Sequence, residues 1–162
     1  MKDSKITFLV QAAAIAAIYV VLTLIFAPIS YGEIQIRISE ALTILPYFTS
    51  AAVPGLFIGC FIANILGGAV LPDIIFGSIA TLLGAAGSYL LRRNKYLVPV
   101  PPIVSNMVIV PFVLKFAYMV PLPVPLMMLT VGIGEVISCG ILGMILLLAL
   151  DKYKGAIFGR RK

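Results

Sequence analysis

Six polar side chains lie within or beside the long apolar segments of this chain and could together form a binding site. They are Arg37, Glu40, Asn64, Asp73, Asn106 and Glu135. A charged side chain near the centre of a membrane helix costs about 2.5–3.5 kcal/mol on insertion scales, so it usually has a partner or a ligand. Carboxylates accept hydrogen bonds, whereas guanidinium groups donate them and amides do both. The set therefore predicts a site that recognises a small polar solute.

The charge balance of this region indicates the class of solute. Four acidic side chains, including Glu33, stand against two basic ones, Arg37 and Lys115, which leaves a difference of two negative charges. A buried site with that surplus prefers a ligand that is cationic or rich in hydrogen-bond donors. Glu135 is the most informative of the acids, because it follows a glycine-rich stretch well inside an apolar segment and has no evident local partner.

Each of these residues also has a purely structural interpretation. Arg37 and Glu40 are three residues apart and could pair on one helical turn. Asp73 directly follows Pro72, as expected of a carboxylate that stabilises a helix N-terminus. Lys115 could extend to the outer lipid headgroups. None of these interpretations excludes contact with a ligand.

The residue types exclude most enzyme classes. The chain contains no histidine, so a Ser–His or Cys–His pair and histidine metal ligands are impossible. It has no Walker A sequence, so any ATP-driven role requires separate subunits. Cys60 and Cys139 lie in apolar runs and are interpreted as small buried residues. We predict no catalytic residues, no metal site and no cofactor.

The composition is that of a polytopic membrane protein. Hydrophobic residues make up 62% of the 162-residue chain and charged residues 11%, whereas soluble domains carry about a quarter charged residues. The expected organisation is one domain, residues 1–162, with no separate soluble module. The apolar segments are 6–26, 38–49, 53–68, 73–91, 98–118 and 125–150.

The basic residues fix the topology of these segments. Ten of the twelve Lys and Arg side chains form three clusters, near the N-terminus, at 92–95 and near the C-terminus. If basic loops remain cytoplasmic, the number of crossings between successive clusters is even. The chain is therefore predicted to be an all-α bundle of six transmembrane helices with both termini in the cytoplasm. The net charge of +6 then reflects contact with the lipid bilayer, and no nucleic acid partner is expected.

Two further stretches carry hypotheses about partners and access. Helix one contains the overlapping small-residue pairs Ala12/Ala16 and Ala13/Ala17, which either pack within the chain or contact another protein. The loop before helix two alternates polar and apolar residues, which predicts an extended segment with Ser39 capping the next helix. This loop is either a lid over the site, with Tyr31, Glu33 and Gln35 as its gating residues, or a plain connection.

Several motifs resemble one known family over nearly the whole chain. They are QIRISEAL at 35–42, LPYF at 45–48, PGLFIG at 54–59 with Asn64, and DIIFGS at 73–78. Together they resemble the QueT family of queuosine-precursor transporters. Members of this family are substrate-binding (S) components of energy-coupling-factor (ECF) vitamin transporters.

The resemblance implies both partners and a ligand. It implies a six-helix protein that works with a transmembrane coupling protein and two cytoplasmic ATPases. The alanine pairs of helix one would contact the coupling protein, and the first external loop would gate the binding site. The implied ligand is a 7-deazaguanine such as preQ1, preQ0 or queuine, whose donor edge a carboxylate can accept. Glu135 or Glu40 would hold that edge and Asp73 the amine. The alternatives are an S component for another vitamin, such as thiamine or riboflavin, or a self-sufficient ion-coupled carrier that uses Glu135.

Overall fold

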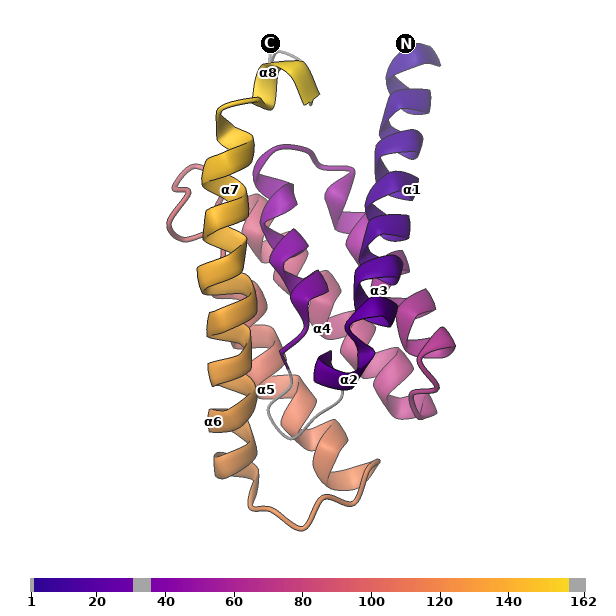
Figure 1. The fold of residues 1–162 in the computed structure, drawn as a ribbon, viewed down its shortest axis with the longest axis vertical. Coiled ribbons are helices and arrows are strands. Elements are labelled where there is room, and N and C mark those ends of the chain that lie inside the picture. The colour runs from indigo at the N-terminus through magenta and orange to yellow at the C-terminus, as the bar shows by residue number, and fades with distance from the viewer. Residues whose placement is uncertain (1, 31–35, 158–162) are drawn as a thin grey trace.

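The chain folds into a bundle of helices, as a computed structural model shows (Figure 1). The structure describes residues 2–30 and 36–157, and no strand occurs among them. The elements are α1 (Lys2–Ile25), α2 (Ala27–Ser30), the 3₁₀-helix η1 (Ile38–Tyr47), α3 (Ala52–Leu66), α4 (Leu71–Leu90), α5 (Val100–Phe116), α6 (Val124–Glu135), the π-helix η2 (Val136–Leu142), α7 (Gly143–Asp151) and α8 (Lys154–Ile157).

The arrangement agrees with the predicted six crossings. Three helical spans are long and apolar enough to cross a membrane alone, namely Ser4–Ile25, Leu71–Leu90 and Val124–Asp151. Two shorter apolar helices, α3 and α5, lie between them in the chain. The N- and C-terminal ends lie at the same end of the bundle, and the α5–α6 turn lies at the opposite end (Figure 1). The protein is thus an all-helical, multi-pass membrane protein.

The predicted second helix is present, but it is a 3₁₀-helix. Ten residues of η1 are wound this tightly, although 3₁₀ runs longer than three or four residues are uncommon. At about 2.0 Å per residue the segment spans roughly 20 Å, which is longer than an α-helix of the same length. Every residue from Ser39 to Pro46 is buried. Because the surrounding helices enclose η1, this short segment does not itself need to cover the bilayer with apolar surface.

Small residues bring α1 and α3 into close contact. A Cβ atom added to Gly55 would lie 2.7 Å from the Ala12 carbonyl oxygen, and one added to Gly59 would lie 3.1 Å from the Ala16 Cα. Ala12 and Ala16 are accordingly buried, whereas Ala13 and Ala17 are exposed. The expectation that all four alanines contact a partner protein is therefore corrected, because α3 already covers two of them.

The long C-terminal span changes its winding at the level of Glu135. α6 ends at this residue, and the next seven residues form the π-helix η2 before α7 begins. A π-turn adds a residue to the helical turn and frequently marks a functional site. Here it buries Ser138 and Cys139 against the centre of the bundle.

The α1–α3 contact generates a prediction about stability. Replacing Gly55 with alanine should destabilise the protein by about 1–3 kcal/mol, because the new methyl group meets backbone atoms that cannot rotate away. Thermal unfolding in detergent micelles measures this as a lower Tm. The matched control is Gly140→Ala, since a Cβ at that position meets its nearest neighbour at an ordinary 3.7 Å. An unchanged Tm for Gly55→Ala would show that the helices can separate without cost.

Candidate functional site

The six polar residues singled out in the sequence are all buried in the bundle. Their side chains come from the segment just before η1, from η1 itself and from α3, α4, α5 and α6. They are Arg37, Glu40, Asn64, Asp73, Asn106 and Glu135, with relative exposures between 0% and 6%. The structure therefore brings residues that are up to about a hundred positions apart in the chain into one buried region.

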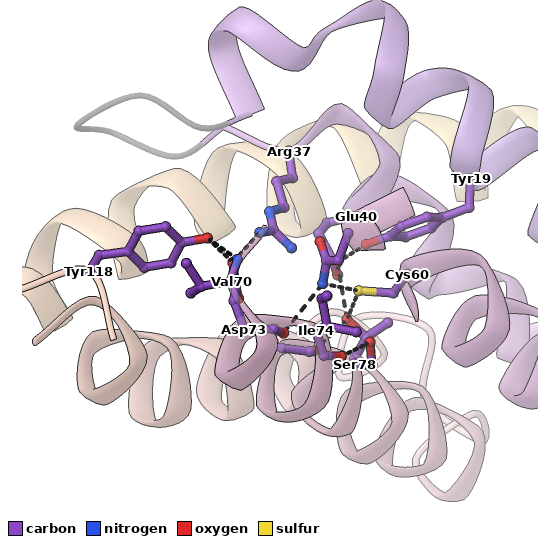
Figure 2. A network of polar contacts seen from close by, with 12 residues as sticks. Tyr19, Arg37, Glu40, Cys60, Val70, Asp73, Ile74, Ser78 and Tyr118 are labelled. Atoms are coloured by element: carbon purple, nitrogen blue, oxygen red, sulfur yellow. Dashed lines mark hydrogen bonds and ion pairs between the residues drawn. The ribbon is translucent and has the colours of Figure 1, made fainter. Parts of the chain in front are cut away.

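Glu40 lies at the centre of this region and is held by two hydroxyl groups. The Tyr19 hydroxyl, from α1, and the Thr81 hydroxyl, from α4, both donate to Glu40 Oε1, the latter at 3.3 Å. Tyr19 and Glu40 are each 1% exposed. Figure 2 shows the Tyr19 and Glu40 side chains pointing toward one another. Glu40 is thus tied to two different helices through a single carboxylate oxygen.

Glu135 lies beside Glu40 on the C-terminal span. The Cys139 thiol lies 3.1 Å from Glu135 Oε2 and 3.4 Å from the Glu40 carbonyl oxygen. The Thr43 hydroxyl reaches Cys139 Sγ at 3.4 Å. One side-chain atom each of Glu40, Glu135 and Cys139 lies within 4.8 Å of the other two. The Asn106 amide, from α5, interacts with both carboxyl groups.

Asp73 anchors the second half of the region, nearer the ends of the helices. Arg37 Nη2 lies 3.8 Å from Asp73 Oδ2, and the Tyr118 hydroxyl donates to the same oxygen at 2.9 Å. Burial, together with the negative charge and hydrogen bond of Asp73, raises the pKa of Tyr118 to about 12, so this phenol remains a donor at neutral pH. Figure 2 shows Arg37 extending into the space between Asp73 and Glu40.

Asn64 and Cys60, both on α3, connect the two halves. Asn64 Nδ2 donates to the Asp73 carbonyl oxygen at 3.4 Å and lies 3.6 Å from Cys60 Sγ. The Thr81 hydroxyl reaches the same sulfur at 3.4 Å while also contacting Glu40. A continuous chain of polar contacts therefore runs from Tyr118 through Asp73 and Asn64 to Glu40.

Four local expectations from the sequence were wrong or incomplete. Among the described residues the ion pair of Arg37 is with Asp73 and not with Glu40. Ser39 does not cap η1, because its hydroxyl accepts a hydrogen bond from Thr23 at 2.7 Å. Glu135 does have a local partner, since Cys139 lies one turn further along the span.

The remaining expectation concerns Lys115, and it changes the charge count. Its ammonium group donates to the Leu122 carbonyl oxygen at 3.2 Å in the α5–α6 turn. Within the described residues the buried region thus holds three carboxyl groups against the single guanidinium of Arg37, so acidic groups outnumber basic ones by two. The predicted gating residues Tyr31, Glu33 and Gln35 lie outside the described residues.

Sequence reasoning missed four residues that position the carboxylates. They are Tyr19, Cys60, Thr81 and Cys139. For Cys139 a signal existed, because its four-residue spacing from Glu135 places both on one helical face. For Thr81 no sequence signal existed, since Ser and Thr hydroxyls in apolar helices often bond their own backbone, as Thr81 also does. For Tyr19 nothing in the sequence separated it from the other tyrosines of the chain.

Several buried polar atoms in this region have no hydrogen-bond partner among the residues that the structure describes. They include Glu40 Oε2, Asn64 Oδ1 and Ser138 Oγ. Buried polar groups are nearly always paired, and leaving one unpaired costs about 1–3 kcal/mol. Two of the three atoms are carbonyl-type oxygens that can only accept, unless the carboxyl is protonated. The arrangement is therefore suited to binding a solute that donates hydrogen bonds or carries positive charge.

Comparison with known proteins identifies relatives. Residues 9–152 match the profile of a family described as QueT transporter. A curated protein of Lactococcus lactis subsp. cremoris (strain MG1363), named Queuosine precursor transporter QueT, is 40% identical over 85 residues. The aligned part covers 51% of this chain and about half, 50%, of that relative. No solved structure matches the chain.

The Asp73–Tyr118 contact generates the second prediction. Asp73→Asn and Tyr118→Phe should each lower the free energy of unfolding, and the double variant should lose less than the sum by about 0.5–3 kcal/mol, because the first change removes the charge from the same hydrogen bond whose donor the second change removes. Chemical denaturation in detergent measures the coupling. Tyr96→Phe, at an exposed tyrosine, serves as the control partner and should show additive losses with Asp73→Asn. Additivity for Tyr118 as well would mean that the two groups do not interact in solution.

Proposed function

We propose that the protein binds a queuosine precursor from outside the cell and takes part in its import. The chain belongs to the QueT transporter family, whose profile matches residues 9–152. The observation that carries the proposal is the convergence of Glu40, Asp73 and Glu135 in one buried region where acidic groups outnumber basic ones by two. Unpaired carboxylates are costly within a membrane, and a donor-rich solute would offset that cost. The name of the Lactococcus relative supports a queuosine precursor as this solute.

The chemistry of 7-deazaguanines suits this set of side chains. Their N1–H and 2-amino groups lie side by side, so one carboxylate can accept both in a bidentate contact. Their O6 and ring nitrogen accept hydrogen bonds, and Asn64, Asn106 and Arg37 supply the donors. Some queuosine precursors also carry an amine that is protonated at neutral pH, which a surplus of negative charge favours.

The position of the site supports uptake from the outer face. Arg37, Asp73 and Tyr118 lie at the beginning of η1, at the beginning of α4 and just after α5. The α5–α6 turn, which contains Tyr118, lies at the end of the bundle opposite the termini (Figure 1). If the basic terminal segments remain in the cytoplasm, this end faces outward.

Movement of the solute across the membrane would require partners. We propose the role of an S component that works with a transmembrane coupling protein and two cytoplasmic ATPases. Support comes from α1, where Ala13 and Ala17 are exposed small residues. On a different face of α1, an apolar groove of about 340 Å³ between α1, η1 and α7, lined in part by Ala14, Leu42 and Leu146, offers room for an apolar side chain of a coupling helix.

Ligand titration tests the proposed substrate. The purified protein should bind at least one 7-deazaguanine more tightly than thiamine or riboflavin, and Glu135→Gln should weaken that binding at least tenfold because it removes a buried acceptor charge. Asp151→Asn is the matched control, since the Asp151 carboxylate pairs with Lys154 near the C-terminus. This variant should bind the 7-deazaguanine with unchanged affinity. Preferential binding of thiamine or riboflavin would support the alternative vitamin, and unaltered affinity of Glu135→Gln would remove that residue from the site.

Uptake into vesicles tests the need for partners. Ala17→Leu should abolish ATP-dependent uptake and co-purification with the coupling protein while the free protein still binds ligand, because the larger side chain separates the two helices. Ala149→Leu, at an exposed alanine of α7, is the control and should behave as wild type. Uptake by the purified chain in the absence of ATPases would instead support a self-sufficient ion-coupled carrier.

A further inference from the structure

The negative charge of the buried region is not evenly distributed. Asp73 has compensation from Arg37 at 3.8 Å and a hydrogen bond from Tyr118 at 2.9 Å. Within the described part of the chain neither Glu40 nor Glu135 forms an ion pair. The uncompensated charge is therefore concentrated at the two glutamates, and Asp73 is the carboxylate least in need of a cation.

The two glutamates are too close for both to be ionised in an empty site. One carboxyl oxygen of each lies within 4.8 Å of the other, and the side chains are 1% and 5% exposed. Like charges at this distance, removed from water, repel strongly, so such a pair retains a proton until a cation arrives. The pair therefore carries one negative charge when no ligand is bound.

The hydrogen bonds indicate which carboxyl group gives up the proton on binding. Glu40 Oε1 accepts from both Tyr19 and Thr81, and donors of this kind favour the ionised form. The hydrogen bond that the described residues give Glu135 comes from the Cys139 thiol, which is a weak donor, and the Asn106 amide is shared by both carboxyl groups. The proton is accordingly held mainly on Glu135, with the Glu40 carboxylate as its neighbour.

Independent features of the region point to a ligand at this pair. Across residues 2–30 and 36–157, Glu40 Oε2 and Ser138 Oγ find no hydrogen-bond partner although they are buried, and such atoms in a native protein call for an explanation. The π-helix that begins after Glu135 is the kind of irregularity often retained at functional sites. A bound, positively charged donor would give Glu40 Oε2 a hydrogen-bond partner and would also compensate the negative charge of the Glu40–Glu135 pair.

We infer that the Glu40–Glu135 pair, and not Asp73, receives the positively charged group of the substrate, and that binding releases one proton to solvent. This inference rests on the proposed function. In the exchange Glu135 loses its proton as the ligand's ammonium group enters, so the net charge of the region is the same before and after binding. The surrounding titratable and charged groups are Tyr19, Arg37, Cys60 and Cys139, and α4 and α5 present the neutral Thr81 and Asn106.

The consequence is a selectivity that depends on pH. A precursor with a protonated amine competes with the bound proton, so its affinity should fall about tenfold for each pH unit below the titration range of the pair, since one proton is exchanged. A neutral precursor displaces no proton, and its affinity should not follow this slope. The preference for the aminomethyl compound should therefore increase as the pH rises.

Calorimetry tests the proton exchange directly. The purified protein is titrated with 7-aminomethyl-7-deazaguanine and with 7-cyano-7-deazaguanine in phosphate and in Tris, two buffers with different ionisation enthalpies. The aminomethyl compound should release about one proton and the cyano compound none. The comparison uses the wild-type protein, so it does not depend on whether a variant folds.

Two substitutions locate the exchange. Glu135→Gln should abolish the proton release and weaken binding of the aminomethyl compound at least tenfold, with a smaller effect on the cyano compound. Asp73→Asn should leave the proton release at about one, because Asp73 is not the acceptor of the amine. If Asp73→Asn instead removes the release and Glu135→Gln keeps it, the assignment is overturned.

The outcomes separate this inference from the proposed function. If neither compound binds, the proposed function fails. If both bind and the number of protons released is the same for both, the function stands and the inference fails. Tighter binding of the cyano compound at every pH would also overturn the inference.

Discussion

The structure depends on keeping one carboxylate, that of Glu40, buried at the centre of an apolar bundle. Its side chain accepts hydrogen bonds from α1 and α4, and its backbone carbonyl contacts the C-terminal span through Cys139. A buried ionised group requires such donors, because desolvation in a low-dielectric environment is expensive. The helices are therefore joined by polar contacts as well as by apolar packing.

The irregular helices follow from the same requirement. η1 is a 3₁₀-helix whose ten residues present Glu40 and Thr43 inward while every side chain from Ser39 to Pro46 is buried. η2 is a π-helix that positions Cys139 against Glu135. Both irregular segments lie beside the two glutamates, whereas the regular helices α1, α3, α4 and α5 surround them. Regular geometry is interrupted where polar side chains must converge.

The charged groups of the region form two parts with different roles. Near the helix ends, Arg37 and Asp73 compensate each other's charge and Tyr118 donates a hydrogen bond to Asp73, which connects three segments of the chain. Deeper in the bundle, Glu40 and Glu135 have hydroxyl, thiol and amide neighbours but no ion pair among the described residues. The outer group is suited to holding the segments together, and the inner pair is suited to binding a cation or a donor.

The sequence singled out six polar residues, and the structure buries all of them. The sequence by itself determined the class of the protein, the six crossings and the placement of both termini at one end of the bundle. These follow from hydropathy and from the distribution of basic residues, which depend on local composition. The tertiary structure decided that Arg37 pairs with Asp73 and that Ala12 faces α3. It also decided that Tyr19 and Thr81 hold Glu40. Such pairings depend on how helices rotate about their axes and on which residues lie opposite after folding, and no periodicity within a single segment carries that information.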